Sequence, residues 1–143
     1  MTYSEAHRDL FTVPKSYHLA HCIASDLAMG AGIAVPMQKK FHLRGSLRNF
    51  ELGGGSLKHP TCVKVYRVFN LITKAKSSGN PTLNSLKKSL DIMKEMVVKY
   101  DIKQLAMPKI GCGLDRLHWG SVRKHLIDTF EGVDVEILVC VWK

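Results

Sequence analysis

Hydrophobic positions along the chain recur with two different spacings, and each spacing predicts a different element. Apolar residues at steps of three and four predict a helix that is capped by Thr82 and reaches about Tyr100. The same spacing predicts a last helix from about Trp119 to Phe130. Apolar residues that run together without this spacing predict strands. These strand segments are Tyr17–Ile23, one long strand or two strands within Val63–Thr73, the short run from Leu105 to Pro108, and Val135–Trp142.

The remaining segments complete an alternation of strands and helices. A short helix is predicted from Ala34 to Phe41, because Pro36 is tolerated in a first turn. The stretch from His42 to Pro60 contains Gly45 and a glycine triplet, and it is predicted to be a mobile loop. Strands that alternate with helices predict an α/β fold, a three-layer α/β/α sandwich with a mixed central sheet. The length of 143 residues fits one domain over residues 1–143.

Composition and charge narrow the class of protein. A hydrophobic fraction of 45% with 23% charged residues is typical of a globular chain, and no apolar run approaches the roughly 20 residues of a membrane span. The start, Met1 to Asp9, is polar and unlike a signal peptide, so we expect the protein in the cytoplasm and nucleus. A net charge of +9 favours anionic partners, although basic residues in small scattered groups are also typical of solvated helix faces.

The four cysteines do not indicate a metal site. Cys22, Cys62, Cys112 and Cys140 are widely separated and form no Cys-x-x-Cys pair, so we expect free thiols, no zinc and no other metal. Cys112 lies between two glycines, but a catalytic cysteine needs a base partner that no sequence feature supplies.

Two glycine loops follow predicted strands. Gly111-Cys112-Gly113 comes after the run from Leu105, and Gly30-Ala31-Gly32 comes after the run that ends at Ile23. Glycines let the backbone approach a ligand and turn its N–H groups outward, and loops at the carboxyl ends of parallel strands share one edge of a sheet. Two such loops can hold a diphosphate from both sides. Alternatively, each pair of glycines only makes a tight turn between strand and helix.

Four segments of the chain resemble one known family. They are His21-Cys22-Ile23, Met29-Gly-Ala-Gly-Ile-Ala34, Leu71-Ile-Thr-Lys74 and Met107-Pro-Lys-Ile-Gly-Cys-Gly-Leu-Asp-Arg116. They are similar to the macrodomain of the terminal ADP-ribose protein glycohydrolase, also called O-acetyl-ADP-ribose deacetylase. The resemblance runs from about Arg8 to about Val141. It departs at Arg8, where the family has Gly, and at Ala24, where the family has Ser.

The resemblance implies a set of site residues. It assigns catalysis to Lys74 and Asp115, although a lysine at a strand end would otherwise be read as solvated. The implied ADP-ribose-binding residues are Asp9, Leu10, His21, Ile23, Gly30, Ala31, Gly32, Ile33, Pro108, Ile110, Gly111, Cys112, Gly113, Leu114 and Trp142. Three of these have simpler interpretations as well: His21 as a packed core residue, Asp9 as a turn or cap residue, and Trp142 as a strand-end aromatic on the core.

The function implied by the resemblance is hydrolysis without a cofactor or metal. The substrates would be ADP-ribose esters on Glu or Asp of modified proteins, with O-acetyl-ADP-ribose as a small relative, in a nuclear DNA damage response. Alternatives are a module that only binds ADP-ribose or poly-ADP-ribose, a hydrolase of ADP-ribosylated nucleic acid, and a basic nucleic-acid-binding protein. The last is disfavoured because the sequence shows no clustered aromatic and basic patch. We expect a monomer.

Overall fold

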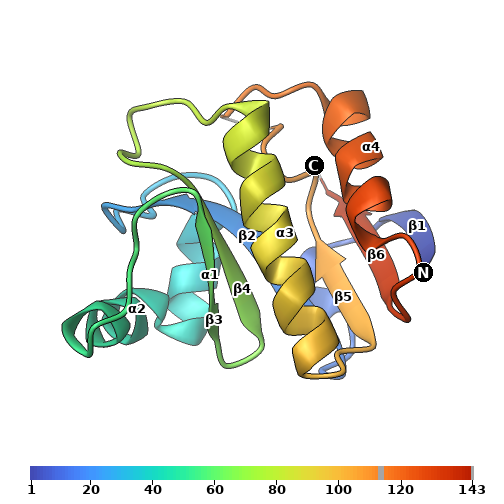
Figure 1. Ribbon diagram of the computed structural model, residues 1–143, viewed down its shortest axis with the longest axis horizontal. Helices are drawn as coiled ribbons and strands as arrows, with labels where there is room; N and C mark the ends of the chain where they lie inside the picture. Colours follow the sequence, from blue (N-terminus) through green and yellow to red (C-terminus); the bar gives the residue numbers. More distant parts are fainter. Residues whose placement is uncertain (113–114, 143) are drawn as a thin grey trace.

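A mixed six-stranded sheet forms the centre of the protein, whose computed structural model describes residues 1–112 and 115–142 (Figure 1). The strand order is β1-β6-β5-β2-β4-β3, and only β3 runs antiparallel to its neighbour β4. The strands are β1 (Thr2–His7), β2 (His18–Ala24), β3 (Thr61–Val65), β4 (Val68–Lys74), β5 (Gln104–Met107) and β6 (Glu136–Val141). The helices are α1 (Ala34–Phe41), α2 (Leu43–Leu52), α3 (Leu83–Lys99) and α4 (Trp119–Phe130), with a short 3-10 turn at Leu10–Thr12.

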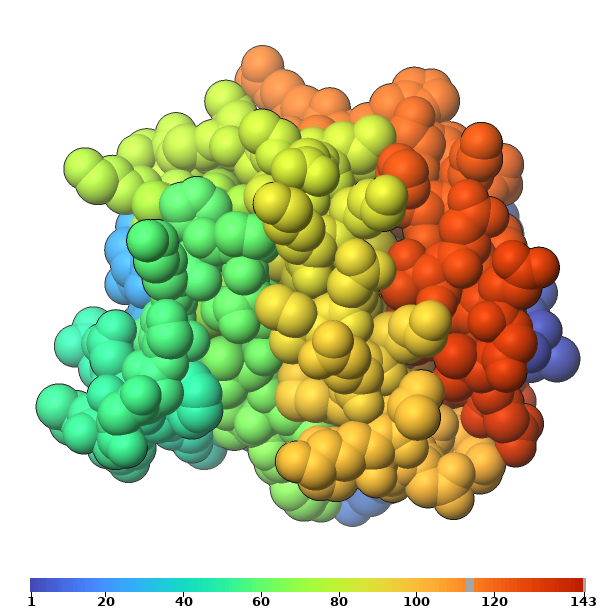
Figure 2. All heavy atoms as spheres, in the orientation of Figure 1, coloured from blue at the N-terminus to red at the C-terminus, as the bar shows by residue number. Residues whose placement is uncertain are grey.

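Two apolar cores lie on opposite faces of this sheet. One contains side chains of α1 and α2, including Met37 and Leu47, and the other contains side chains of α3 and α4, including Met93 and Leu126. Figure 2 shows the second face, where α3 in yellow and α4 in red-orange cover the strands. The expected three-layer α/β/α sandwich with a mixed sheet is therefore confirmed.

The predicted elements agree closely with the observed ones, except for β1, which the sequence did not predict, and for the segment from His42 to Pro60. Thr82 caps α3 with its side chain, and the run Val63–Thr73 divides into β3 and β4. The segment from His42 to Pro60, however, is not a continuous loop, because α2 occupies Leu43–Leu52. Leu43 and Leu47, one turn apart, are fully buried, and this apolar contact outweighs the cost of Gly45 in the helix.

Three parallel strands end at the same edge of the sheet. β2 pairs with β4 on one side and with β5 on the other, all in parallel, so Ala24, Lys74 and Met107 end neighbouring strands. In open sheets of this kind, ligands bind beyond the carboxyl ends of the strands. Among the residues that the structure describes, no helix is both long and apolar enough to cross a membrane.

Candidate active site

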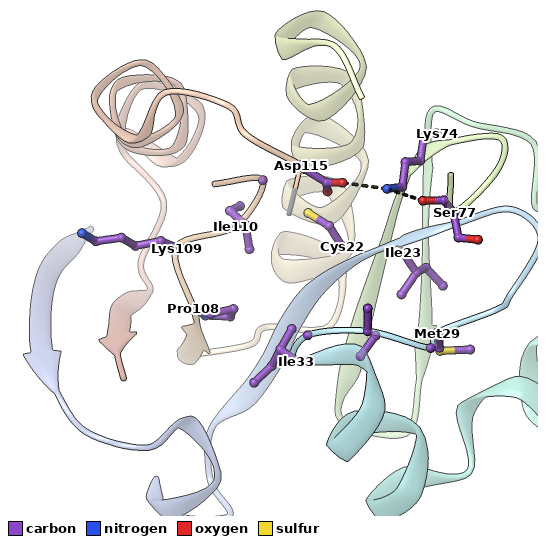
Figure 3. Close-up of a pocket in the computed structure, with 16 residues that line it drawn as sticks. Cys22, Ile23, Met29, Ile33, Lys74, Ser77, Pro108, Lys109, Ile110 and Asp115 are labelled. Carbon is purple, nitrogen blue, oxygen red and sulfur yellow. Dashed lines mark hydrogen bonds and ion pairs between the residues drawn. The ribbon is translucent and has the colours of Figure 1, made fainter. Parts of the chain in front are cut away.

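A cavity of about 320 Å³ opens at this edge, between the two glycine loops (Figure 3). Its walls come from the end of β2, the loop before α1, the end of β4 and the loop after β5. Ten of the residues expected at the site line it: Ile23, Gly30, Ala31, Gly32, Ile33, Lys74, Pro108, Ile110, Gly111 and Asp115. The two loops therefore do face one cavity from opposite sides, as the sequence predicts.

The first loop is held in place from outside the cavity by Arg44. Its guanidinium donates hydrogen bonds to the carbonyl oxygens of Leu27 at 2.8 Å and Ala28 at 2.6 Å. Leu27 and Met29 adopt left-handed backbone conformations, with φ of 58° and 47°, which side chains disfavour. Helix α2, which the sequence did not predict, thus has a role at the site. Arg44 in its first turn holds the strained backbone that leads into the loop.

The second loop needs a glycine at position 111. Gly111 has φ of +73°, and a Cβ there would lie 3.0 Å from Leu117 Cδ1 and 3.2 Å from Leu86 Cδ2. Its carbonyl accepts a hydrogen bond from the Leu117 N–H at 2.7 Å, which returns the chain towards α4. Gly113 and Leu114, which were expected to bind the ligand, lie outside the described residues.

Lys74 and Asp115 meet at the cavity wall. Lys74 Nζ lies 2.7 Å from Asp115 Oδ1, and each side chain is 15% exposed (Figure 3). The same amine donates to the carbonyl oxygens of Ser77 and Gly79, at 3.2 Å each. The structure therefore joins an amine and a carboxylate that are far apart in the sequence, at a place where a ligand held by both loops can reach them.

Other predicted site residues lie away from the cavity. His21 is fully buried, and its Nε2 is 2.7 Å from Asn70 Oδ1, so its side chain is packed as a core residue. Leu10 is also buried in the core, at 2% exposure. Asp9 accepts a hydrogen bond from the Phe11 N–H and caps the 3-10 turn. Trp142 is 66% exposed, so the alternative in which it packs on the core is wrong.

Cys112 does not have the surroundings of a nucleophile. Its thiol donates to the Ile110 carbonyl oxygen, and burial raises the pKa of this thiol, which disfavours the thiolate. Burial likewise raises the pKa of Cys22, which does line the cavity. All four cysteines are unbridged. Within the described ranges, no group of three or more His, Cys, Asp or Glu side chains is placed to hold a metal ion.

The structure shows the contacts and surroundings of the two residues that depart from the family pattern. Arg8 donates to the side chain and the carbonyl of Thr12, and this stabilises the 3-10 turn. Ala24 lies in the cavity wall, at the position where the resemblance leads us to expect a serine. Ser25 does not replace the hydroxyl of that serine, since its Oγ donates to the Leu57 carbonyl at 2.7 Å.

Sequence reasoning missed six residues of the cavity wall: Cys22, Ala24, Met29, Ala34, Ser77 and Lys109. Four of them lie inside the quoted motifs and Ala24 directly follows one, so including every residue of each motif and the next position finds these five. Ser77 has no such signal, because it enters the site through the turn that follows β4. Figure 3 shows that the Lys109 side chain extends away from the Lys74–Asp115 pair.

Comparison with known proteins identifies the family of the chain. No protein-family model matches the sequence. The human ADP-ribose glycohydrolase OARD1 is 44% identical over 131 residues, which cover 92% of this chain and 86% of the relative. The chain belongs to the OARD1 family.

Solved structures related to this OARD1 family member show the same fold. The macrodomain of Mycobacterium tuberculosis DarG superposes with a TM-score of 0.86 at 18% identity, covering 97% of both chains. Thermosipho africanus DarTG in complex with ADP-ribose gives a TM-score of 0.78 at 16% identity, covering 98% of this chain and 41% of that one. The family and the macrodomain fold expected from the sequence motifs are both confirmed, and the expectation of a hydrolase agrees with the family.

Proposed function

We propose that the protein hydrolyses the ester that joins ADP-ribose to a Glu or Asp side chain of a modified protein, and that it also deacylates O-acetyl-ADP-ribose. The observation that carries the proposal is the 2.7 Å contact between Lys74 Nζ and Asp115 Oδ1 in the wall of the cavity. A module that only binds ADP-ribose needs the two loops but has no need of this pair. Membership of a glycohydrolase family supports the same conclusion.

The two loops supply the binding energy in this proposal. Backbone N–H groups of residues 30–32 and of residues 110 and 111 would donate to the diphosphate, and donors of this kind require no metal; Gly113 and Leu114, also expected to contribute, lie outside the described residues. Apolar side chains beside them, such as Ile23 and Ile33, give the cavity walls that exclude water. A diphosphate fixed in this way places the distal ribose beside Lys74 and Asp115, which lie in the same cavity.

The chemistry follows from the pair. The Lys74 amine, after losing a proton to solvent, attacks the anomeric carbon of the distal ribose. A bond between Nζ and this carbon forms, while the bond from the carbon to the ester oxygen breaks and its electron pair leaves with the Glu or Asp carboxylate. Water then adds to the adduct, with Asp115 transferring protons, and this releases ADP-ribose and restores the amine.

The test is turnover of a protein that carries ADP-ribose on glutamate, followed by mass spectrometry. Lys74→Ala should abolish release of ADP-ribose and leave its affinity within about threefold, because the loops are untouched. Asp115→Ala should accumulate a covalent ADP-ribose adduct on Lys74, because the adduct forms but resolves slowly. Lys87→Ala, an exposed lysine of α3, is the matched control and should keep wild-type turnover.

Two results would contradict the proposal in different ways. Full turnover by Lys74→Ala would exclude the covalent route, whatever the wild-type activity. If the wild-type protein binds ADP-ribose but does not release it from the modified substrate protein, it would be a module that only binds ADP-ribose.

The charge of the chain supports an additional proposal about partners. With a net charge of +9, the protein should attract poly-ADP-ribose or nucleic acid beyond the contacts of a single ADP-ribose. Calorimetric titration with ADP-ribose and with single-stranded nucleic acid, each at two salt concentrations, distinguishes binding of the nucleotide from binding of nucleic acid. Affinity for the nucleic acid should fall steeply with salt, and an absence of binding at low salt would exclude such a partner.

A further inference from the structure

Asp26 is an exposed carboxylate that lies outside the cavity wall and accepts hydrogen bonds from two separate loops. Its Oδ1 accepts from the Ala28 N–H at 3.1 Å. Its Oδ2 accepts from the N–H of Ser77 at 2.8 Å and from the Ser77 hydroxyl at 3.1 Å. The Ser77 and Ala28 N–H groups lower the pKa of Asp26, so the carboxylate stays ionised and these bonds persist over a wide pH range.

The two loops have different tasks at the site. Ala28 belongs to the segment that leads into the first glycine loop, whereas Ser77 belongs to the turn that follows β4. The Ser77 carbonyl in turn accepts from Lys74 Nζ at 3.2 Å. Asp26 is therefore the link between the loop that would hold the ligand and the turn that holds the reactive amine.

The geometry around the amine shows why this turn matters. As an ammonium, Lys74 Nζ has three protons, and its three acceptors are the Ser77 carbonyl, the Gly79 carbonyl and Asp115. When the proton on the Asp115 side is lost, the two remaining N–H groups still match the two carbonyls. The tetrahedral nitrogen then has its lone pair on the side of Asp115, whose carboxylate lies in the cavity wall together with Lys74.

We propose that Asp26 is a positioning residue. By fixing Ser77, it orients the lone pair of Lys74 towards the sugar, and it links this orientation to the position of the first glycine loop. This inference rests on the proposed function, because the lone pair matters only if the amine attacks. Without Asp26, the turn can move and take the Ser77 carbonyl with it, so the amine loses one of the two carbonyl acceptors that orient it. Ground-state binding through the loops is affected much less than attack.

The test compares Asp26→Asn with Asp91→Asn, which removes the same charge from an exposed position of α3. Asparagine replaces one of the two carboxylate oxygens with an NH2 group, so an N–H donor would face either the Ala28 N–H or the Ser77 N–H, where aspartate has an acceptor. Asp26→Asn should lower kcat on ester-linked ADP-ribosyl protein about tenfold, with the Kd for ADP-ribose within about threefold of wild type. In an Asp115→Ala background, it should slow formation of the Lys74 adduct to a similar degree. Asp91→Asn should change none of these values.

A second variant should have an intermediate effect on kcat. Ser77→Ala loses only the hydroxyl contact and keeps the shorter backbone contact, so its kcat should lie between those of Asp26→Asn and wild type. Unchanged kcat in Asp26→Asn would overturn the inference, as would an equal loss of kcat and of ADP-ribose affinity, which would indicate collapse of the whole site. If the wild type turns over no ester at all, the proposed function fails first and this inference fails with it.

Discussion

The buried imidazole of His21 should make the stability of the protein fall in mild acid. His21 is fully buried, and Asn70 donates from Nδ2 to the Val63 carbonyl, so Asn70 Oδ1 accepts from His21 Nε2. Nδ1 has no partner among the described residues, and a proton added there would be buried without an acceptor. Burial, opposed in part by the Asn70 contact, lowers the pKa of His21 to about 4.

The sign and size of the effect follow from linkage. In the unfolded chain a histidine titrates near about 6.5, so between about pH 6.5 and 4 the unfolded state binds a proton that the folded state does not. Stability is therefore complete above pH 6.5 and is lost as the pH falls through this window. At about 1.4 kcal/mol per pKa unit, the loss amounts to about 3 kcal/mol by pH 4. This is a large part of the stability of a typical domain.

The assay is urea unfolding at several pH values between 7 and 4, with His21→Gln beside the wild type. Glutamine stays neutral and can still donate to Asn70, so the stability difference between the two proteins should shrink or reverse by about 3 kcal/mol over this range. His7→Gln removes an exposed imidazole from β1 and serves as the control. Parallel curves for wild type and His21→Gln would refute the reasoning, because they would mean that His21 does not control the acid response.

Three further predictions concern the two loops and α2. Arg44→Ala should weaken ADP-ribose binding about tenfold in calorimetry, about 1.4 kcal/mol, because the Leu27 and Ala28 carbonyls lose their anchor; unchanged affinity would show that the loop holds itself. Gly111→Ala should lower the free energy of unfolding by about 1 to 2 kcal/mol, since φ is +73° there. Gly45→Ala, inside α2 with open space around it, should raise stability by about 0.5 to 1 kcal/mol, and equal effects of the two would contradict this account.

Much of the fold could be predicted from the sequence because most elements carry a strong local signal. The Thr82 cap and the three- and four-residue steps after it define α3 almost to the residue. The helix α2 was missed because Gly45 and the glycine triplet were taken as breakers, although Leu43 and Leu47 stand one turn apart. Glycine marks a turn only when apolar spacing does not run through it, and here it does.

The candidate site could be predicted only where a motif is continuous in the chain. Lys74, Asp115 and the glycine loops were found because each lies in a recognisable stretch. Asp26 and Ser77 were not, since their importance comes from hydrogen bonds between two turns that are distant in sequence. His21 was included because it stands in a motif, and the structure shows its imidazole fully buried against Asn70, which is the simpler interpretation that its sequence position also allows.

The order of the strands also has a consequence for contacts between copies of the protein. β1 and β3 are the outermost strands, and the exposed backbone of an outer strand is a template for pairing with another chain. Glu5 stands in the middle of β1 and Lys64 in the second half of β3. Two copies that aligned like edges, β1 with β1 or β3 with β3, would bring equal charges together as water leaves, so the charges oppose this kind of edge-to-edge pairing.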